Sequence, residues 1–193
     1  MPSDPQPEQR DTVERAVESL LQALGHDVTG ELAATPSRVA ELWLGHLLSG
    51  HQTDLDALDL SASPSDCSDP VSLVDIGIHM VCPHHLTIAF GKAHVAYTPK
   101  GKLIGFGSIA NLVSVCTQRL ILQEEAAALI ARTLVTKLDA TAAVAVLDAT
   151  HPCHNVVHPR SHQARAVSWA RAGDTTAAAQ LEASLRETIL SEK

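Results

Sequence analysis

The sequence predicts an α+β protein in which a single sheet carries helices on one face. Three observations lead to this prediction. Apolar residues recur at helical spacing in the first 50 residues, β-like segments start near Val71 and again near Thr141, and two helical segments lie between them. Elements grouped in this order favour one sheet with helices packed against it. Such a sheet keeps free edges and a half-covered surface, so self-association is expected.

Composition divides the chain into four parts. Residues 1–10 are polar and proline-rich and are expected to form a disordered tail. Residues 11–50 are expected to form a helical arm, whereas residues 51–70 are rich in Ser, Asp and Pro and are typical of a linker. Residues 71–193 contain all the β segments and form the predicted sheet domain.

Two helices are expected in the arm. Between Thr12 and Leu24, apolar residues recur every three or four positions, as on one face of a helix. The second helix starts in ATPSRVAELW, where Thr35 is a suitable N-cap and Pro36 suits the first helical position. We expect this helix to end at Gly50.

The sheet domain combines strands with helices. The segment LTIAFGKAHVAY, residues 86–97, alternates well enough for a strand pair, and the TPKG that follows is typical of a turn. TAAVAVLDATHPC, residues 141–153, is expected to be a strand throughout. The remaining expected elements are helices over 107–123, 124–139 and 175–190 and a short strand over 165–171.

Charge and composition argue against several classes of protein. The formal net charge of −8, from 14 basic and 22 acidic residues, argues against a nucleic-acid or anionic-membrane partner. No apolar run approaches the length of a membrane span, and the polar N-terminus argues against a signal peptide. The four cysteines therefore indicate thiols in a reducing compartment, and we expect a cytoplasmic protein.

Cysteine and histidine residues in two distant segments suggest a metal site. Cys82 and His85 have a C-x-x-H spacing, and thiolate and imidazole are ligands that zinc prefers. If residues 141–153 form a strand, His151 and Cys153 point to the same face, so Cys153 could complete a Cys/His/Cys set. Three protein ligands leave a fourth position for water, which is the arrangement of catalytic zinc.

Two histidines beside these ligands suggest a hydrolase, although other interpretations stay open. His84 and His151 would lie next to the metal and could move protons during hydrolysis of a carbon–nitrogen bond. Alternatively, the zinc is structural and His154 closes the site as a fourth ligand. In a third interpretation there is no metal, and the cysteines are small buried apolar residues.

The order and spacing of these motifs resemble the GTP cyclohydrolase I family. The resemblance rests on CPHHLTIAFGKAHVAYTPKGKLIGFG, LVSVCTQRLILQE, THPCH and, in the arm, TPSRVAELW. It implies a T-fold, in which several subunits form a barrel, usually as a decamer with active sites between subunits. It also implies attack of water at C8 of GTP with loss of formate, which yields 7,8-dihydroneopterin triphosphate for folate or biopterin synthesis.

The resemblance implies a role for each matching residue. Cys82, His85 and Cys153 correspond to the zinc ligands. His84 and His151 correspond to the two catalytic histidines, and His151 would protonate the purine ring nitrogen. Gln123 and Glu124 correspond to the residues at the guanine edge, where a carboxylate can accept two hydrogen bonds from adjacent N–H groups. Position alone would make Glu124 an ordinary solvated acid at a helix start.

The residues that correspond to triphosphate contacts depart from the family pattern. Gly107 stands for a serine near the ribose, Ser108 for a lysine and Asn111 for an arginine. Val157 stands near another expected arginine. Only Arg38, in TPSR, remains as a corresponding phosphate contact. Because charge-assisted contacts contribute about 1.5–3 kcal/mol each, losing three of them would weaken triphosphate binding markedly.

Three hypotheses follow from this pattern. The chain is a working GTP cyclohydrolase whose phosphate contacts are rebuilt, for which Arg160 and Arg165 are candidates. Alternatively, it is a diverged paralogue that acts on a less phosphorylated purine or stops after ring opening. In the third hypothesis, it is a non-catalytic, zinc-containing oligomer.

Overall fold

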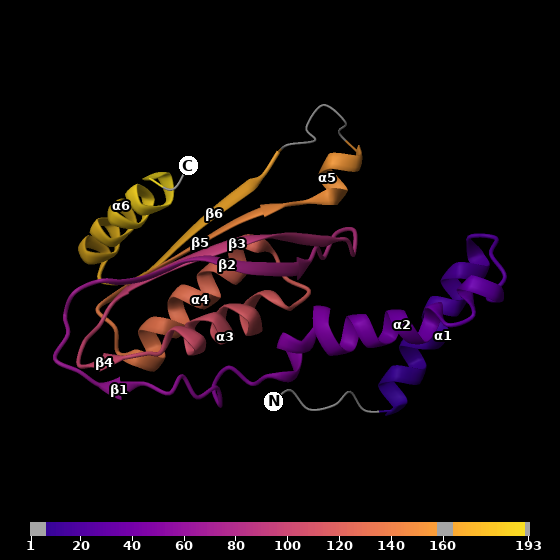
Figure 1. The fold of residues 1–193 in the computed structure, drawn as a ribbon, viewed down its shortest axis with the longest axis horizontal. Helices are drawn as coiled ribbons and strands as arrows, with labels where there is room; N and C mark the ends of the chain where they lie inside the picture. Colours follow the sequence, from indigo (N-terminus) through magenta and orange to yellow (C-terminus); the bar gives the residue numbers. More distant parts are fainter. Residues whose placement is uncertain (1–6, 158–163, 192–193) are drawn as a thin grey trace.

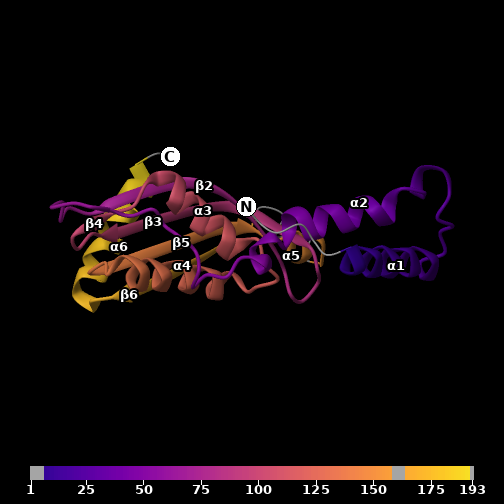
Figure 2. The same ribbon diagram turned by 90° about the horizontal axis from the view of Figure 1, so that it is seen from below.

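The computed structural model describes residues 7–157 and 164–191 and shows an elongated molecule. A helical arm projects from one end of an α+β body, as Figures 1 and 2 show. The body is built on a four-stranded antiparallel sheet in the order β2-β3-β5-β6. The α+β fold class predicted from the sequence is therefore confirmed.

The arm contains α1 (Pro7–Ala23) and α2 (Thr35–Leu42), which pack against each other. The first helix begins at Pro7, inside the segment predicted as a tail, and residues 1–6 lie outside the described part of the chain. The N-cap of α2 is Ala34 rather than Thr35, although proline does take one of the first helical positions. The expected continuous helix to Gly50 is wrong, because α2 changes into the π-helix η2 (Trp43–Leu47) and the 3-10 helix η3 (Ser49–Gln52).

The segment predicted as a linker contains a short piece of sheet. Strand β1 (Ser63–Pro64) pairs antiparallel with β4 (Lys102–Leu103) and forms a separate two-stranded sheet. This pair lies at the end of the body opposite the arm, at the left of Figure 1.

The main sheet consists of β2 (Val71–Val81), β3 (Ile88–Thr98), β5 (Ala142–Thr150) and β6 (Ala166–Gly173). Residues 86–97 do not form a strand pair of their own. They belong largely to β3, whose hairpin partner is β2, with Val81 opposite Ile88. The sheet places β2 and β6 at its two edges.

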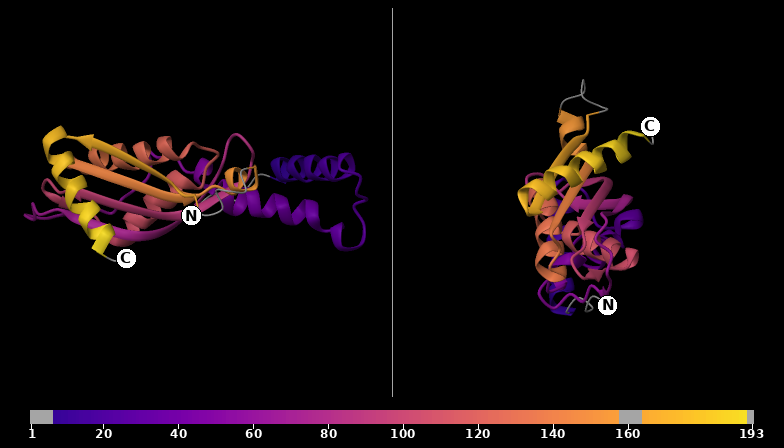
Figure 3. Two further views of the ribbon diagram at one scale, coloured as in Figure 1. Left: turned by 90° about the horizontal axis from the view of Figure 1, so that it is seen from above. Right: turned by 90° about the vertical axis from the view of Figure 1, so that its left-hand side faces the viewer.

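Helices cover both faces of the sheet rather than one. α3 (Phe106–Thr117) and α4 (Gln123–Leu138) enclose the main core on one face, where Ala145 and Leu147 of β5 are fully buried. α6 (Thr175–Ser191), the yellow helix in Figure 3, lies across the opposite face of the sheet. It packs there against Val144 and Val146 of the same strand. Successive side chains of a strand point to opposite faces, and β5 is apolar on both sides, so both faces need a cover. Within the described residues, no helix is long and apolar enough to cross a membrane.

Candidate metal centre and active site

The hairpin between β2 and β3 positions the first two candidate ligands. The backbone N–H of Cys82 donates to Thr87 O at 2.9 Å, and Leu86 N–H donates to Cys82 O at 2.9 Å. Leu86 has a φ of 54°, a left-handed conformation that closes this tight turn. The turn brings the imidazole of His85 over the thiol of Cys82, with 4.0 Å between Nδ1 and Sγ.

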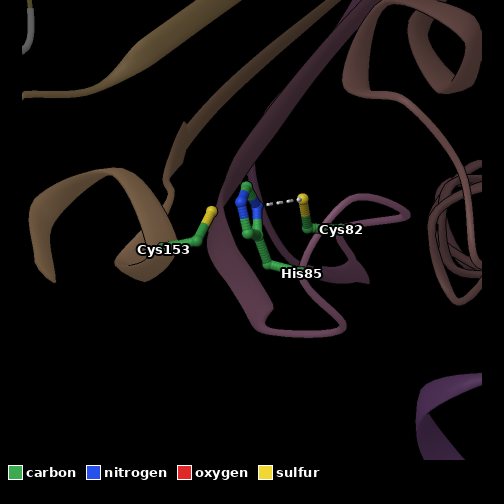
Figure 4. A group of neighbouring side chains, drawn as sticks. All are labelled: Cys82, His85 and Cys153. Carbon is green, nitrogen blue, oxygen red and sulfur yellow. Dashed lines mark hydrogen bonds between the residues drawn. The ribbon is translucent and has the colours of Figure 1, made fainter. Parts of the chain in front are cut away.

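The third ligand comes from a short helix and not from a strand. β5 ends at Thr150, and α5 (Pro152–Val157) starts where the sequence predicted continued strand. The correction has a physical reason, because proline lacks a backbone N–H for the sheet and its fixed φ suits the first turn of a helix. The ligand atoms of Cys82, His85 and Cys153 nevertheless lie within 4.8 Å of one another, and Figure 4 shows them converging.

This donor set fits a zinc ion. Two thiols and one imidazole are common zinc ligands, and tetrahedral coordination separates neighbouring ligand atoms by about 3.3–3.8 Å. The separation of 4.0 Å between Cys82 Sγ and His85 Nδ1 therefore needs only a small adjustment. Among the residues that the structure describes, the group contains no fourth ligand, and His154 in particular is not part of it. Within the described residues, three ligands with one open position are the arrangement typical of catalytic zinc.

His151 lies two residues before Cys153 in the chain and is held by Gln123. Its Nε2 atom is 2.8 Å from Gln123 Oε1. Burial lowers the pKa of His151 from its ordinary value, the charge of Glu124 opposes this shift, and His154 adds to it. The lowered pKa favours the neutral imidazole, which can take part in proton transfer.

Glu124 and Gln123 begin helix α4 but have different surroundings. Glu124 is exposed, and Ser168 Oγ is 3.4 Å from its Oε1, so the carboxylate stays accessible to a ligand. Gln123, which the resemblance places at the guanine edge, is only 4% exposed. Both hydrogens of its amide are donated to backbone carbonyls, those of Leu147 and Ala166, so its side chain is not free to bind a substrate in this way.

A cavity of about 340 Å³ adjoins His151. It is lined by α5 and the start of β6, including His154 and Arg165. Arg165 forms an ion pair with Asp148, so the guanidinium is already partly neutralised. Arg160 lies outside the described residues.

The residues expected near ribose and phosphates lie far from the metal centre of the same chain. Gly107, Ser108 and Asn111 occupy the first turns of α3, next to β4. Ile104, just before this helix, donates its N–H to the hydroxyl of Tyr97, near the end of β3 farthest from the hairpin. Tyr97 lies nine residues along β3 from Ile88, and this length of strand spans roughly 30 Å at 3.4 Å per residue.

The two remaining predicted residues are accessible but not part of the cluster. His84 is exposed on the hairpin, with its ring centroid 6.2 Å from that of His85. Arg38 lies in α2, within the arm. The structure thus brings together the metal and base-edge residues of one chain and leaves the phosphate-side residues apart.

Comparison with known proteins decides the family. The family model described as GTP cyclohydrolase I matches residues 13–190. The chain belongs to the GTP cyclohydrolase I family. Relatives named GTP cyclohydrolase 1 include a Chromobacterium violaceum protein, 38% identical with 83% of this chain and 79% of that protein covered, and a Bacillus subtilis protein, 34% identical with 85% and 87% covered.

Other similarities are more limited in extent. A Synechococcus protein named GTP cyclohydrolase 1 is 40% identical over 72% of this chain, and the match spans only 61% of that relative. Among solved structures, the apo form of the archaeosine synthase QueF-Like superposes with a TM-score of 0.47 at 18% identity, with 57% of this chain and 99% of that chain covered.

Three contacts at the site could not be anticipated from the sequence. Two of them are the position of Ser168 next to Glu124 and the bridge that Gln123 makes between two strands. Both depend on how the start of α4 meets β5 and β6, which no local sequence pattern reports. The ion pair between Arg165 and Asp148 likewise joins residues whose proximity depends on strand register.

Proposed function

We propose that this chain opens the imidazole ring of a guanine nucleotide by hydrolysis at C8, releases formate and leads to 7,8-dihydroneopterin triphosphate. The observation that carries the proposal is the convergence of Cys82, His85 and Cys153 beside His151 and Glu124. The family relationship supports the choice of a purine nucleotide as substrate. A reducing compartment, the cytoplasm, is part of the proposal, because thiols must stay available as ligands.

Each side chain at the site has its own role in the proposed reaction. Cys82, His85 and Cys153 would hold zinc, which when bound supplies the Lewis acidity that a hydrolysis at neutral pH needs. His151 and the exposed His84 on the hairpin would transfer protons to and from the ring. Glu124 would accept two hydrogen bonds from adjacent N–H groups of guanine and so orient C8 toward the metal.

We further propose that the complete site needs more than one chain. The start of α3, with Gly107, Ser108 and Asn111, lies toward the end of β3 farthest from the hairpin that carries Cys82 and His85, so these residues do not meet the metal centre of their own chain. A barrel formed through the edge strands β2 and β6 would bring this segment of one chain near the metal centre of another. A homodecamer is the assembly that the family resemblance implies.

A second candidate function follows from the charges. Gly107, Ser108, Asn111 and Val157 provide no cation, and Arg165 beside the cavity is already paired with Asp148. This supports a purine with fewer phosphates as the substrate, or a reaction that stops after ring opening. The shared step, hydrolysis at C8, is the same in both candidates.

One experiment separates these candidates. Zinc-loaded protein is incubated with GTP, GMP and guanosine, and formate release and pterin fluorescence are followed separately. Formate and fluorescence from GTP alone support the complete reaction, whereas preference for GMP or guanosine, or formate without fluorescence, supports the second candidate. Formate from none of the three contradicts both and leaves a non-catalytic oligomer.

A further inference from the structure

We propose that Gln123 is a positioning residue that fixes the orientation and the tautomer of His151. Gln123 is the first residue of α4 and is almost fully buried. Its side chain contacts the sheet where β5 and β6 stop pairing, since their register ends at Ala149 and Ala166. A buried amide at this point connects the rigid sheet to the residues that follow β5.

Two backbone carbonyls determine which way the amide of Gln123 faces. Its Nε2 atom donates to Leu147 O at 2.8 Å and to Ala166 O at 2.9 Å. Only the nitrogen of the amide carries hydrogens, so only the nitrogen can serve two acceptors. A flipped amide would lose both bonds and place its oxygen against two carbonyl oxygens. The oxygen Oε1 is therefore the atom that faces His151.

This orientation determines the tautomer of the neighbouring ring. His151 Nε2 lies 2.8 Å from Gln123 Oε1, a good hydrogen-bond distance. Because Oε1 can only accept, Nε2 must carry the hydrogen, and the neutral ring keeps its lone pair on Nδ1. Gln123 thus selects one of two tautomers and holds the plane of the ring at the same time.

The role in turnover rests on the proposed function. If His151 acts on the purine, Nδ1 is the ring atom left to contact the substrate, while Nε2–H stays bonded to Gln123. Partners that orient a metal-ligating histidine typically contribute 10–100-fold to activity or metal affinity, and we expect an effect of similar size on His151. This is a role through His151, and it replaces the direct contact of Gln123 with substrate that the family resemblance suggested.

The test combines a spectroscopic and a kinetic measurement on the zinc-loaded full chain. Protein labelled with [15N]histidine is studied by solid-state 15N NMR, and the His151 signals are assigned by difference from His151→Asn. We expect the Nε2–H form in the wild type and a shift toward the Nδ1–H form in Gln123→Met. In that variant kcat should fall about 10–100-fold, with KM and zinc content within about twofold of wild type.

Thr117→Val is the matched control. Its hydroxyl is buried and donates to Val113 O at 2.9 Å within α3, so the variant also loses a buried hydrogen bond. It should lower stability without changing the His151 signals or kcat by more than about twofold. An Nδ1–H tautomer in the wild type overturns the proposal even if Gln123→Met does not fold. Unchanged His151 signals, or an unchanged kcat in a folded and active protein, also overturn it. A tautomer shift in a protein that releases no formate would instead contradict the proposed function alone.

Discussion

Replacing Gly91 by alanine should separate β3 from β5 and weaken the metal centre that these strands support. Gly91 lies opposite Ala149 in the register. A Cβ atom at this position would lie 2.7 Å from Ala149 Cα and 2.9 Å from the carbonyl carbon of Asp148, and it would also overlap the Asp148 oxygen. Since carbon atoms in contact lie about 3.5–4.0 Å apart, the strands must separate by about 1 Å.

This displacement has two measurable consequences. Overpacking of this kind costs roughly 2–3 kcal/mol, which for a chain of this size lowers Tm by about 4–12 °C. Because β3 follows the hairpin that carries His85 and β5 leads into Cys153, the ligands would also move relative to one another. Differential scanning calorimetry and zinc titration with a competing chelator measure the two effects, and both Tm and zinc affinity should fall.

Gly77→Ala provides the matched control in the neighbouring strand. A Cβ atom on Gly77 would meet no atom within 4 Å, and its backbone is not in the left-handed region. We expect its stability to stay within about 0.5 kcal/mol of wild type, with unchanged zinc affinity. If Gly91→Ala matched Gly77→Ala in both measurements, the close approach of β3 and β5 would be wrong.

Three further predictions concern single side chains. Cys153→Ala should abolish stoichiometric zinc binding in elemental analysis while Cys116→Ala retains it, and equal zinc in both variants would contradict the ligand set. Burial raises the pKa of Cys116 to about 12, so its thiol should resist iodoacetamide at pH 8 until the protein unfolds; rapid labelling of the native protein would refute this. Burial raises the pKa of Glu182, but hydrogen bonds from Arg186 and Arg171 outweigh it and give a net lowering. Glu182→Gln should therefore reduce the free energy of unfolding at neutral pH. Urea unfolding should show that the difference in stability from wild type disappears as the pH falls below 4.5 and through the lowered pKa. If the difference persisted in acid, it would not be electrostatic.

The strands and helices of the body could largely be predicted because their apolar spacing is regular. The position of α6 was harder to predict, although the apolar run of β5 contained a usable signal. Val144 and Val146 alternate with Ala145 and Leu147, so both sides of this strand require burial. A strand whose residues alternate between apolar and polar would have agreed with the prediction that helices cover only one face of the sheet.

Local sequence patterns predicted the ligands of the candidate site but not the contacts around them. The ligands Cys82, His85 and Cys153 were predicted from residue type, even though the strand expected to carry Cys153 ends before it. Pro152 occupies the first position of α5, and a proline there is compatible with a helix start but not with continued strand pairing. The role of Gln123 could not be predicted, because its partners come from two strands that lie far along the chain.

Direct analysis of the metal tests the central claim, which is that two thiols and one imidazole bind a zinc ion. Protein purified without added chelator is analysed for zinc and studied by X-ray absorption at the zinc edge. We predict one zinc per chain, coordinated by two sulfur atoms and the nitrogen of His85, with one lighter ligand completing the shell. A native, folded protein without tightly bound metal, or zinc without sulfur ligands, would contradict the account.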